Sequence, residues 1–221
     1  MMTRIISALV MAPIAIAAIW FGSPYFDLMI FVVGLAAMFE WYRLASLEGL
    51  RGINLVWLLA GVVYIAVPCV VVIWLRRIDP QGFQFIIWIF VVIWATDIGA
   101  YFTGRSLGGA KLAPKISPNK TWAGFFGGII LAIAASLILN DYANPSYGTL
   151  ELLAASLVLS IVGQLGDLLE SWVKRVFGVK DSGSLIPGHG GVLDRIDAIL
   201  LAAPVAGLIA VFFQIGQIPW K

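Results

Sequence analysis

The chain has 221 residues, of which 61% are hydrophobic and 12% charged, with a net charge of +2 and a mean hydropathy of +0.98. A soluble domain carries about twice that share of charged residues and a disordered chain is poor in apolar ones, so both classes are excluded. The small net charge gives no reason to expect nucleic acid as a partner. Long unbroken apolar runs, rather than short alternating ones, predict an all-α polytopic membrane protein.

Seven apolar stretches are long enough to cross a bilayer as helices, which takes about 20 residues each. Together they predict a single integral membrane domain over residues 1–221, folded as a bundle of about seven transmembrane helices. The stretches are Ile5–Gly22, Tyr25–Leu44, Ile53–Leu75, Phe83–Phe102, Trp122–Leu139, Leu150–Val173 and Val192–Ile215.

Two of these stretches have a second interpretation. Pro68 in the third stretch predicts a kink, or else a pair of short re-entrant segments. Arg4 before the first apolar run, with small residues at 15–17, also fits a signal peptide. Because the apolar residues continue through Trp20 and Phe21, we favour an uncleaved first helix.

The lysines and arginines set the orientation, because they gather on the cytoplasmic side of membrane proteins. With the N-terminus inside, 11 of the 14 basic residues lie on that side. The polar, basic loop Gly104–Thr121 and the glycine-rich loop Gly178–Gly191 then both face the cytoplasm. The short turn Asn140–Thr149 faces the opposite side.

Five of the acidic residues within the last four apolar stretches are candidates for a site, because a charge costs at least about 2.5 kcal/mol at a helix centre. They are Asp97 in the fourth stretch, Asp167 and Glu170 in the sixth, and Asp194 and Asp197 in the seventh. All lie toward the predicted cytoplasmic ends of their helices, so we expect them to converge in one cytoplasm-facing polar cavity. Cys69 is the only cysteine and His189 the only histidine, which excludes a cysteine cluster and the two-histidine metalloprotease motif.

Helical spacing places acids on two surfaces. Asp167 is followed after three, four and seven residues by Glu170, Ser171 and Lys174, so these side chains share one face. The two aspartates of the seventh stretch share another. Carboxylates crowded into one site need a neutralising cation, and oxygen ligands without histidine or cysteine favour Mg²⁺, with a second cation left open.

Helix-end ion pairs are the alternative interpretation of the same charges. Lys174 is a correctly spaced partner for Glu170, whereas Asp167 and Asp194 have no neighbour of sufficient charge on their own helix face. Near the inner end of the second stretch, a glutamate and an arginine three residues apart, Glu40 and Arg43, are interpreted as a structural pair.

Basic residues and glycines from the two loops complete the predicted site. Glycines let backbone N–H groups approach an anion, and a helix N-terminus favours negative charge, so this combination suits a polyphosphate bound to Mg²⁺. His189 lies among three glycines, where either a phosphate contact or a structural hydrogen bond fits. The residues are Lys111, Lys115, Lys120, Lys174, Arg175, Lys180, Gly188, Gly190 and Gly191.

The second half of the chain resembles a known family. Residues 171–197 contain SWVKR, then KDSG, then LIPGHGGVLDRID, and this pattern resembles the signature of the phosphatidate cytidylyltransferases, the CDP-diacylglycerol synthases. GDLLES at 166–171, SPNKTW at 117–122 and Thr96-Asp97 with Ala100-Tyr101 resemble its flanking motifs, while Ala123 stands where many members carry an acid. The resemblance marks residues 94–197 as the catalytic region, and the helices of residues 1–82 carry no recognised motif.

The resemblance implies that CTP and phosphatidate give CDP-diacylglycerol and pyrophosphate, with Mg²⁺ required. Metal ions and basic side chains would offset the repulsion between the two anions and the charge on the leaving group. We assign catalytic roles to Asp167, Lys174, Arg175, Lys180, Asp181, Asp194 and Arg195. Substrate phosphates would contact Ser117, Lys120, Thr121, His189, Gly190 and Gly191. Asp97, Glu170 and Ser171 would line the cavity, and Asp167, Asp194 and Asp197 would bind metal.

The expected partners are CTP, phosphatidate and membrane lipids, and a homodimer is left open. The expected location is a bacterial inner membrane, with the active site facing the cytoplasm. An ion- or proton-coupled transporter is the alternative function, since intramembrane acids serve there too. Against a transporter, the acids cluster toward one face and no inverted repeat is visible. A CDP-alcohol phosphotransferase is disfavoured because its paired-aspartate helix pattern is not found.

Overall fold

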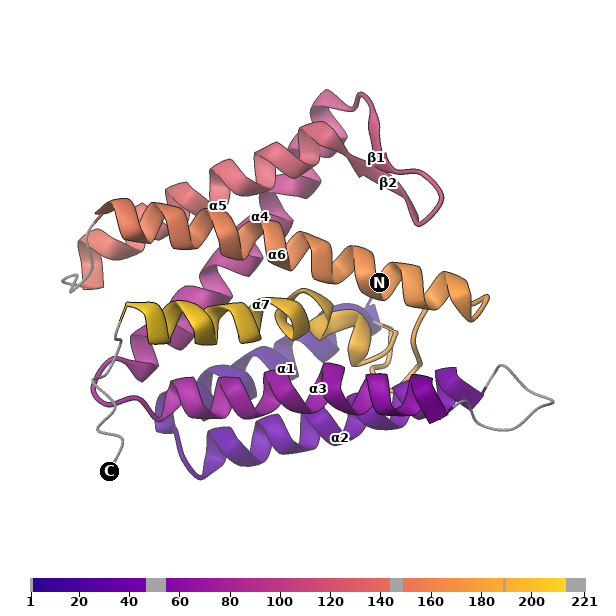
Figure 1. Ribbon diagram of the computed structural model, residues 1–221, viewed down its shortest axis with the longest axis horizontal. Coiled ribbons are helices and arrows are strands. Elements are labelled where there is room, and N and C mark those ends of the chain that lie inside the picture. Colours follow the sequence, from indigo (N-terminus) through magenta and orange to yellow (C-terminus); the bar gives the residue numbers. More distant parts are fainter. Residues whose placement is uncertain (1, 47–54, 144–148, 189, 214–221) are drawn as a thin grey trace.

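The computed structural model describes residues 2–46, 55–143, 149–188 and 190–213, and in these residues the chain forms seven helices and one small hairpin (Figure 1). The helices are α1 (Met2–Phe21), α2 (Tyr25–Ser46), α3 (Leu55–Arg76), α4 (Gly82–Leu107), α5 (Trp122–Ala143), α6 (Thr149–Val176) and α7 (Leu193–Phe212). The strands are β1 (Lys111–Ala113) and β2 (Ser117–Thr121).

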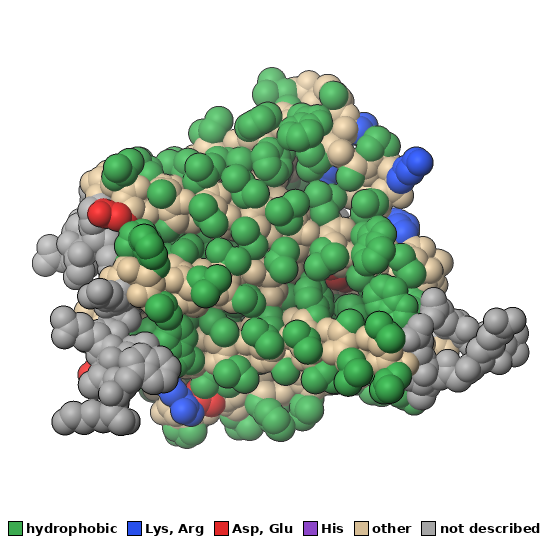
Figure 2. All heavy atoms as spheres, viewed as in Figure 1, with side chains coloured by type: hydrophobic (Ala, Val, Ile, Leu, Met, Phe, Trp, Pro, Cys, Tyr) green, Lys and Arg blue, Asp and Glu red, His purple; other side chains and the backbone are tan. Residues whose placement is uncertain are grey.

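The expected helical membrane bundle is confirmed. Six helices, α2 to α7, contain stretches long and apolar enough to cross a membrane, and α1 contains a shorter apolar stretch, Met11–Phe21. Pro68 lies inside one continuous helix, α3, so the re-entrant alternative is wrong. Hydrophobic side chains cover most of the face seen in Figure 2, as expected for a surface that lipid surrounds.

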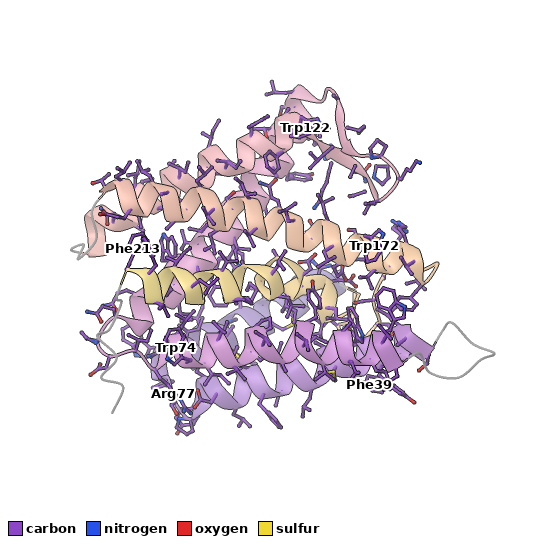
Figure 3. The ribbon with its side chains drawn as sticks, in the orientation of Figure 1. Phe39, Trp74, Arg77, Trp122, Trp172 and Phe213 are labelled. Atoms are coloured by element: carbon purple, nitrogen blue, oxygen red, sulfur yellow. The ribbon has the colours of Figure 1, made fainter. Side chains whose placement is uncertain are left out.

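Successive helices run in alternate directions between the two ends of the molecule, and α4 crosses the others obliquely (Figure 1). The hairpin, the end of α6 and the loop from α6 to α7 therefore lie at one end of the bundle, here called the hairpin end. In Figure 3, Phe39, Trp122 and Trp172 mark this end, whereas Trp74, Arg77 and Phe213 lie toward the other. The two loops that charge counting placed on one side do lie at the same end.

The far end is fixed by arginines at the end of α3. Arg77 forms an ion pair with Asp27 at the start of α2, and the Ser23 hydroxyl donates to the same carboxylate at 2.7 Å. Arg76 Nε donates to the Ile19 carbonyl oxygen at 2.9 Å. These contacts join α1, α2 and α3 on the side opposite the predicted site.

Small residues bring α4 and α5 close together. A methyl group on Gly99 of α4 would lie 2.5 Å from the Gly127 carbonyl oxygen, and one on Gly124 would lie 2.8 Å from the Ala100 carbonyl oxygen. Such close backbone approach is common between membrane helices. Lipid provides no hydrophobic driving force for helix association, so the helices rely on van der Waals packing, which small residues permit. This packing fixes the two helices from which the hairpin projects.

Buried hydroxyl groups join this helix pair to α6. Thr96 Oγ1 donates to Ser160 Oγ at 2.9 Å, and Ser156 Oγ donates to Ser136 Oγ at 2.8 Å. Trp88 Nε1 donates to the same Ser136 hydroxyl at 3.1 Å. Each buried polar group thereby gains a partner in an apolar setting, so α4, α5 and α6 form one connected layer.

The loop Gly104–Thr121 is not irregular, because it contains a short β-hairpin within the otherwise helical fold. Helix α4 extends to Leu107, and Gly108 and Gly109, with φ of 62° and 88°, then reverse the chain in a conformation that favours glycine. Strands β1 and β2 pair antiparallel, with Lys111 opposite Thr121. Thr121 Oγ1 accepts a hydrogen bond from the Gly124 N–H at 3.1 Å, a side-chain cap that begins α5.

Candidate active site

The first contact of the site joins the hairpin to α6. Lys120 Nζ of β2 lies 2.5 Å from Asp167 Oδ2, and both side chains are about one-third exposed or less, at 25% and 33%. Ser171, one turn further along α6, donates to Asp167 Oδ1 at 3.4 Å. The hairpin therefore brings a predicted phosphate-binding lysine onto a predicted metal-binding aspartate.

The second contact is a buried lysine between two acids. Lys174 Nζ lies 2.5 Å from Glu170 Oε2 and 2.7 Å from Asp194 Oδ1. The three side chains are only 12%, 3% and 9% exposed. The predicted pair of Glu170 and Lys174 is confirmed. The expectation that Asp194 lacks a charged partner holds only for its own helix, because Lys174 reaches it from α6.

The loop between α6 and α7 wraps around the Asp194 carboxylate. The N–H groups of Gly191 and Ser182 donate to Asp194 Oδ2 at 2.8 Å and 3.1 Å. Gly190, with φ of 88°, lies so close that a methyl group there would come within 3.0 Å of the same oxygen. The glycine-rich turn thus presents backbone donors to a side chain of the protein itself, where the sequence had suggested a bound anion.

A third group of acids comes from three different helices. Asp97 of α4, Asp167 of α6 and Asp197 of α7 are near enough to repel one another electrostatically. Asp197 Oδ1 also accepts the Ala198 N–H at 2.8 Å. Among the described residues, no three acids, histidines or cysteines gather closely enough to form a metal site. The donor chemistry nevertheless suits a hard cation, because every candidate ligand is a carboxylate oxygen.

The remaining predicted residues surround these contacts. Arg175 Nε donates to the Ile116 carbonyl oxygen of the hairpin at 3.3 Å, and its Nη1 donates to the Val179 carbonyl oxygen at 3.2 Å. Lys180, Asp181 and Arg195 are exposed, Ser117 is half-buried in β2, and Thr121 is buried as the cap of α5. His189 lies outside the described residues.

The predicted ion pair between Glu40 and Arg43 is wrong. Glu40 of α2 is fully buried, and it does not pair with Arg43, which is exposed and lies over the Phe39 ring. Glu40 Oε2 instead accepts hydrogen bonds from Ser182 Oγ at 3.2 Å and from the Leu193 N–H at 3.0 Å. These partners are 142 and 153 residues away in the sequence, so local spacing could not reveal them.

Comparison with known proteins shows the family of the chain. The sequence model of the cytidylyltransferase family matches residues 52–213, which include both loops and the contacts of Asp167, Lys174 and Asp194 but not Glu40. The chain belongs to the cytidylyltransferase family. It is therefore a CTP-dependent nucleotidyltransferase by family, and an enzyme rather than a transporter.

Curated relatives of this cytidylyltransferase match nearly its whole length. The phosphatidate cytidylyltransferase of Brucella suis is 39% identical over 260 aligned residues, with 98% of this chain and 96% of the relative covered. That of Bacillus subtilis is 34% identical, with 97% and 99% covered. That of Rickettsia felis is 37% identical over 214 residues, with 94% and 91% covered. Similarity thus extends into the N-terminal helices, where no motif was recognised.

Proposed function

We propose that this chain is a phosphatidate cytidylyltransferase, which transfers CMP from CTP to phosphatidate and forms CDP-diacylglycerol and pyrophosphate. The observation that carries the proposal is the meeting of two lysine–acid contacts, Lys120 with Asp167 and Lys174 with Asp194, at one end of a membrane bundle. A lipid phosphate and a nucleotide triphosphate can both reach charged groups only where the bundle meets the aqueous phase. The names of the curated relatives support the same pair of substrates.

The reaction requires little from a general base. A phosphate oxygen of phosphatidate attacks the α-phosphorus of CTP, a new P–O bond forms, and the bond to the bridging oxygen of pyrophosphate breaks. The attacking oxygen is already anionic, so the main barrier is the approach of two negatively charged groups. Lys120, Arg175 and Lys180 are positioned around the hairpin end to offset this repulsion and to stabilise the departing pyrophosphate.

The carboxylates would hold the divalent cation that this class of reaction uses. Asp167, Asp194 and Asp197 are the proposed ligands, with Asp97 nearby. Because no three described carboxylates gather closely enough to form a site by themselves, oxygens of the substrate phosphates would complete it, and bound Mg²⁺ would neutralise phosphate charge. In the structure the ammonium groups of Lys120 and Lys174 lie on two of these acids. Lys120 and Lys174 would offset further negative charge of the substrate phosphates beside these carboxylates.

The proposed sidedness follows from charge and from the substrate. The hairpin end carries most of the basic residues, and CTP is a solute of the cytoplasm, so we assign this end to the cytoplasmic face of a bacterial inner membrane. The acyl chains of phosphatidate would stay in lipid while its headgroup enters between helices. Lysine and arginine side chains grouped beside the hairpin in Figure 2 would attract the anionic headgroup.

The test is a reconstituted assay with the purified protein in lipid nanodiscs. Labelled CTP, phosphatidate and Mg²⁺ are expected to give a nucleotide-containing lipid and one equivalent of pyrophosphate. Diacylglycerol in place of phosphatidate is the matched control, because it lacks the attacking phosphate. Label that stays in the aqueous phase, with no pyrophosphate released, would contradict the proposal.

A further inference from the structure

A glutamate from the N-terminal helices, which carry no recognised motif, lies against the loop that joins α6 to α7. Glu40 is 0% exposed, and its carboxylate is surrounded by Ser182, Gly183, Gly191 and Leu193. Among the described residues its Oε1 atom has no hydrogen-bond partner, and no lysine or arginine forms an ion pair with it. Burial of a carboxylate without an ion pair costs desolvation free energy, so we infer that Glu40 serves a purpose that offsets this loss of stability.

Glu40 and Asp194 both accept hydrogen bonds from the same loop. Ser182 donates its hydroxyl to Glu40 at 3.2 Å and its N–H to Asp194 at 3.1 Å. Leu193, which donates its N–H to Glu40 at 3.0 Å, directly precedes Asp194. Both ends of the loop are thereby joined to one glutamate, and the donors that reach Asp194 can keep their direction only while those ends stay in place.

Two glycines of the loop lie so close to the Glu40 side chain that a larger residue would not fit there. A methyl group on Gly183 would overlap the Glu40 carboxylate, and all three of its nearest atoms belong to that side chain. A methyl group on Gly191 would overlap Ser182 Oγ and lie 2.5 Å from Glu40 Oε2. Gly183 and Gly191 are not among the glycines that have a positive φ. Lack of space, and not backbone conformation, therefore excludes a larger residue at these two positions.

The position of Glu40 is set independently of the loop. The next residue, Trp41, is buried and donates its Nε1–H to the Trp57 carbonyl oxygen of α3 at 2.8 Å. The Trp57 ring in turn packs edge-on against Phe177 just after α6, with ring centroids 5.0 Å apart. The end of α2 is thus fixed against α3 and α6, so the glutamate is a firm support for the loop.

We propose that Glu40 is a positioning residue of the cytidylyl transfer, which acts by fixing the Ser182–Leu193 loop so that Asp194 and Lys174 keep their geometry. This proposal rests on the proposed function for the reaction that it supports. Glu40 lies in α2, outside the residues that the family model matches. The proposal therefore assigns a function in the reaction to the N-terminal helices. Glu40 touches no reacting atom and is not itself a catalytic residue.

The first test compares Glu40→Ala with Glu40→Gln. Removing a partner that orients a catalytic group commonly costs about 10- to 100-fold in activity, and we expect a loss of this size for Glu40→Ala. Glutamine keeps an oxygen acceptor of the same reach, so Glu40→Gln is expected to recover most of the loss. The matched control is Asp27→Asn at the other end of the same helix, where the carboxylate bonds Arg77 and Ser23 and activity should stay near wild type.

The second test does not depend on activity. Hydrogen–deuterium exchange in nanodiscs is expected to show faster exchange at the amides of residues 182–193 in Glu40→Ala, with little change in Glu40→Gln or Asp27→Asn. If the wild-type protein makes no nucleotide-containing lipid, the proposed function fails, and this exchange experiment still decides whether Glu40 fixes the loop. Unchanged exchange in Glu40→Ala, or faster exchange with undiminished turnover, would overturn the positioning role.

The third test is a double-mutant cycle, which remains informative if Glu40→Ala is poorly stable. Gly183→Ala should lower activity in the wild-type background because its methyl group displaces the glutamate. In the Glu40→Ala background the same substitution should cost little further, because the obstructing carboxylate is gone. Additive losses would show that the two positions act separately and would contradict the proposal.

Discussion

Lys174 offers the sharpest test of the buried charge cluster. Lys174→Met keeps the length of the side chain but leaves Glu170 and Asp194, at 3% and 9% exposure, without their shared ammonium group. At an effective dielectric constant of about 20, two unit charges 4 Å apart interact by about 4 kcal/mol, and removing one member of a buried pair typically costs about 3–5 kcal/mol. We expect Lys174→Met to lower the free energy of unfolding by that amount and to abolish turnover.

The assay is SDS-induced unfolding in mixed micelles, followed by the fluorescence of the nine tryptophans. Lys180→Met is the matched control, because Lys180 is exposed and a surface change of this kind usually stays within about 0.5 kcal/mol. Adding Glu170→Gln to Lys174→Met removes one unpaired charge, so it should restore part of the stability without restoring activity. A Lys174→Met protein as stable as wild type would refute the reasoning that the ammonium group neutralises two buried carboxylates.

Two further predictions concern the hairpin end, and a third concerns the orientation of the bundle. Asp167→Asn should reduce kcat by more than about 100-fold, which is the upper range for loss of an outer-shell partner of a metal ligand. The free energy of unfolding should change by less than about 1 kcal/mol, because the pair of Asp167 with Lys120 is partly exposed. Steady-state kinetics and unfolding of the same sample check both expectations. Lys120→Ala should lower kcat/KM for CTP by about 100-fold, the loss expected when a donor to the charge that develops in the transition state is removed. Unchanged kinetics would mean that Lys120 serves only as one of the positive charges that set the orientation in the membrane. In a Cys69→Ser background, an impermeant thiol reagent applied to intact cells should label Asp79→Cys but not Ser184→Cys, both exposed positions, and the reverse pattern would invert the assigned orientation.

Much of the fold follows from hydropathy alone. Unbroken apolar runs of suitable length predicted the helices, because lipid forces every backbone polar group in a span to bond within its own segment. The ends of the helices were less predictable. Helix α4 continues through Gly104 and Arg105 to Leu107, and α6 continues to Val176, because a helix that leaves the hydrocarbon need not remain apolar. The hairpin escaped notice since its strands are only three and five residues long.

The site was predictable where its members lie on one helix or carry a family motif. The pair of Glu170 and Lys174 follows from helical spacing, and the acids of α6 and α7 from their cost in a membrane. The contacts of Asp194 with Lys174 and of Glu40 with the loop cross between helices. Residue spacing along the chain contains no information about such contacts, and an arginine three residues away made a wrong local partner for Glu40 attractive.

Helix α6 is longer than the hydrocarbon core of a membrane is thick. Its 28 residues extend about 42 Å at about 1.5 Å per residue, against a hydrocarbon layer of about 30 Å. If its first turn lies at the far interface, Lys174, about 38 Å along the helix, stands in the headgroup layer, where a phospholipid carries its phosphate, and Asp167, about 27 Å along it, lies at the edge of the hydrocarbon. A thicker bilayer would draw these charges toward the acyl chains and raise their desolvation cost, whereas a thinner one would lift them above the headgroups. The length of one helix thus matches the site to a particular membrane thickness, and lipid composition becomes a determinant of how readily substrate and charged groups meet.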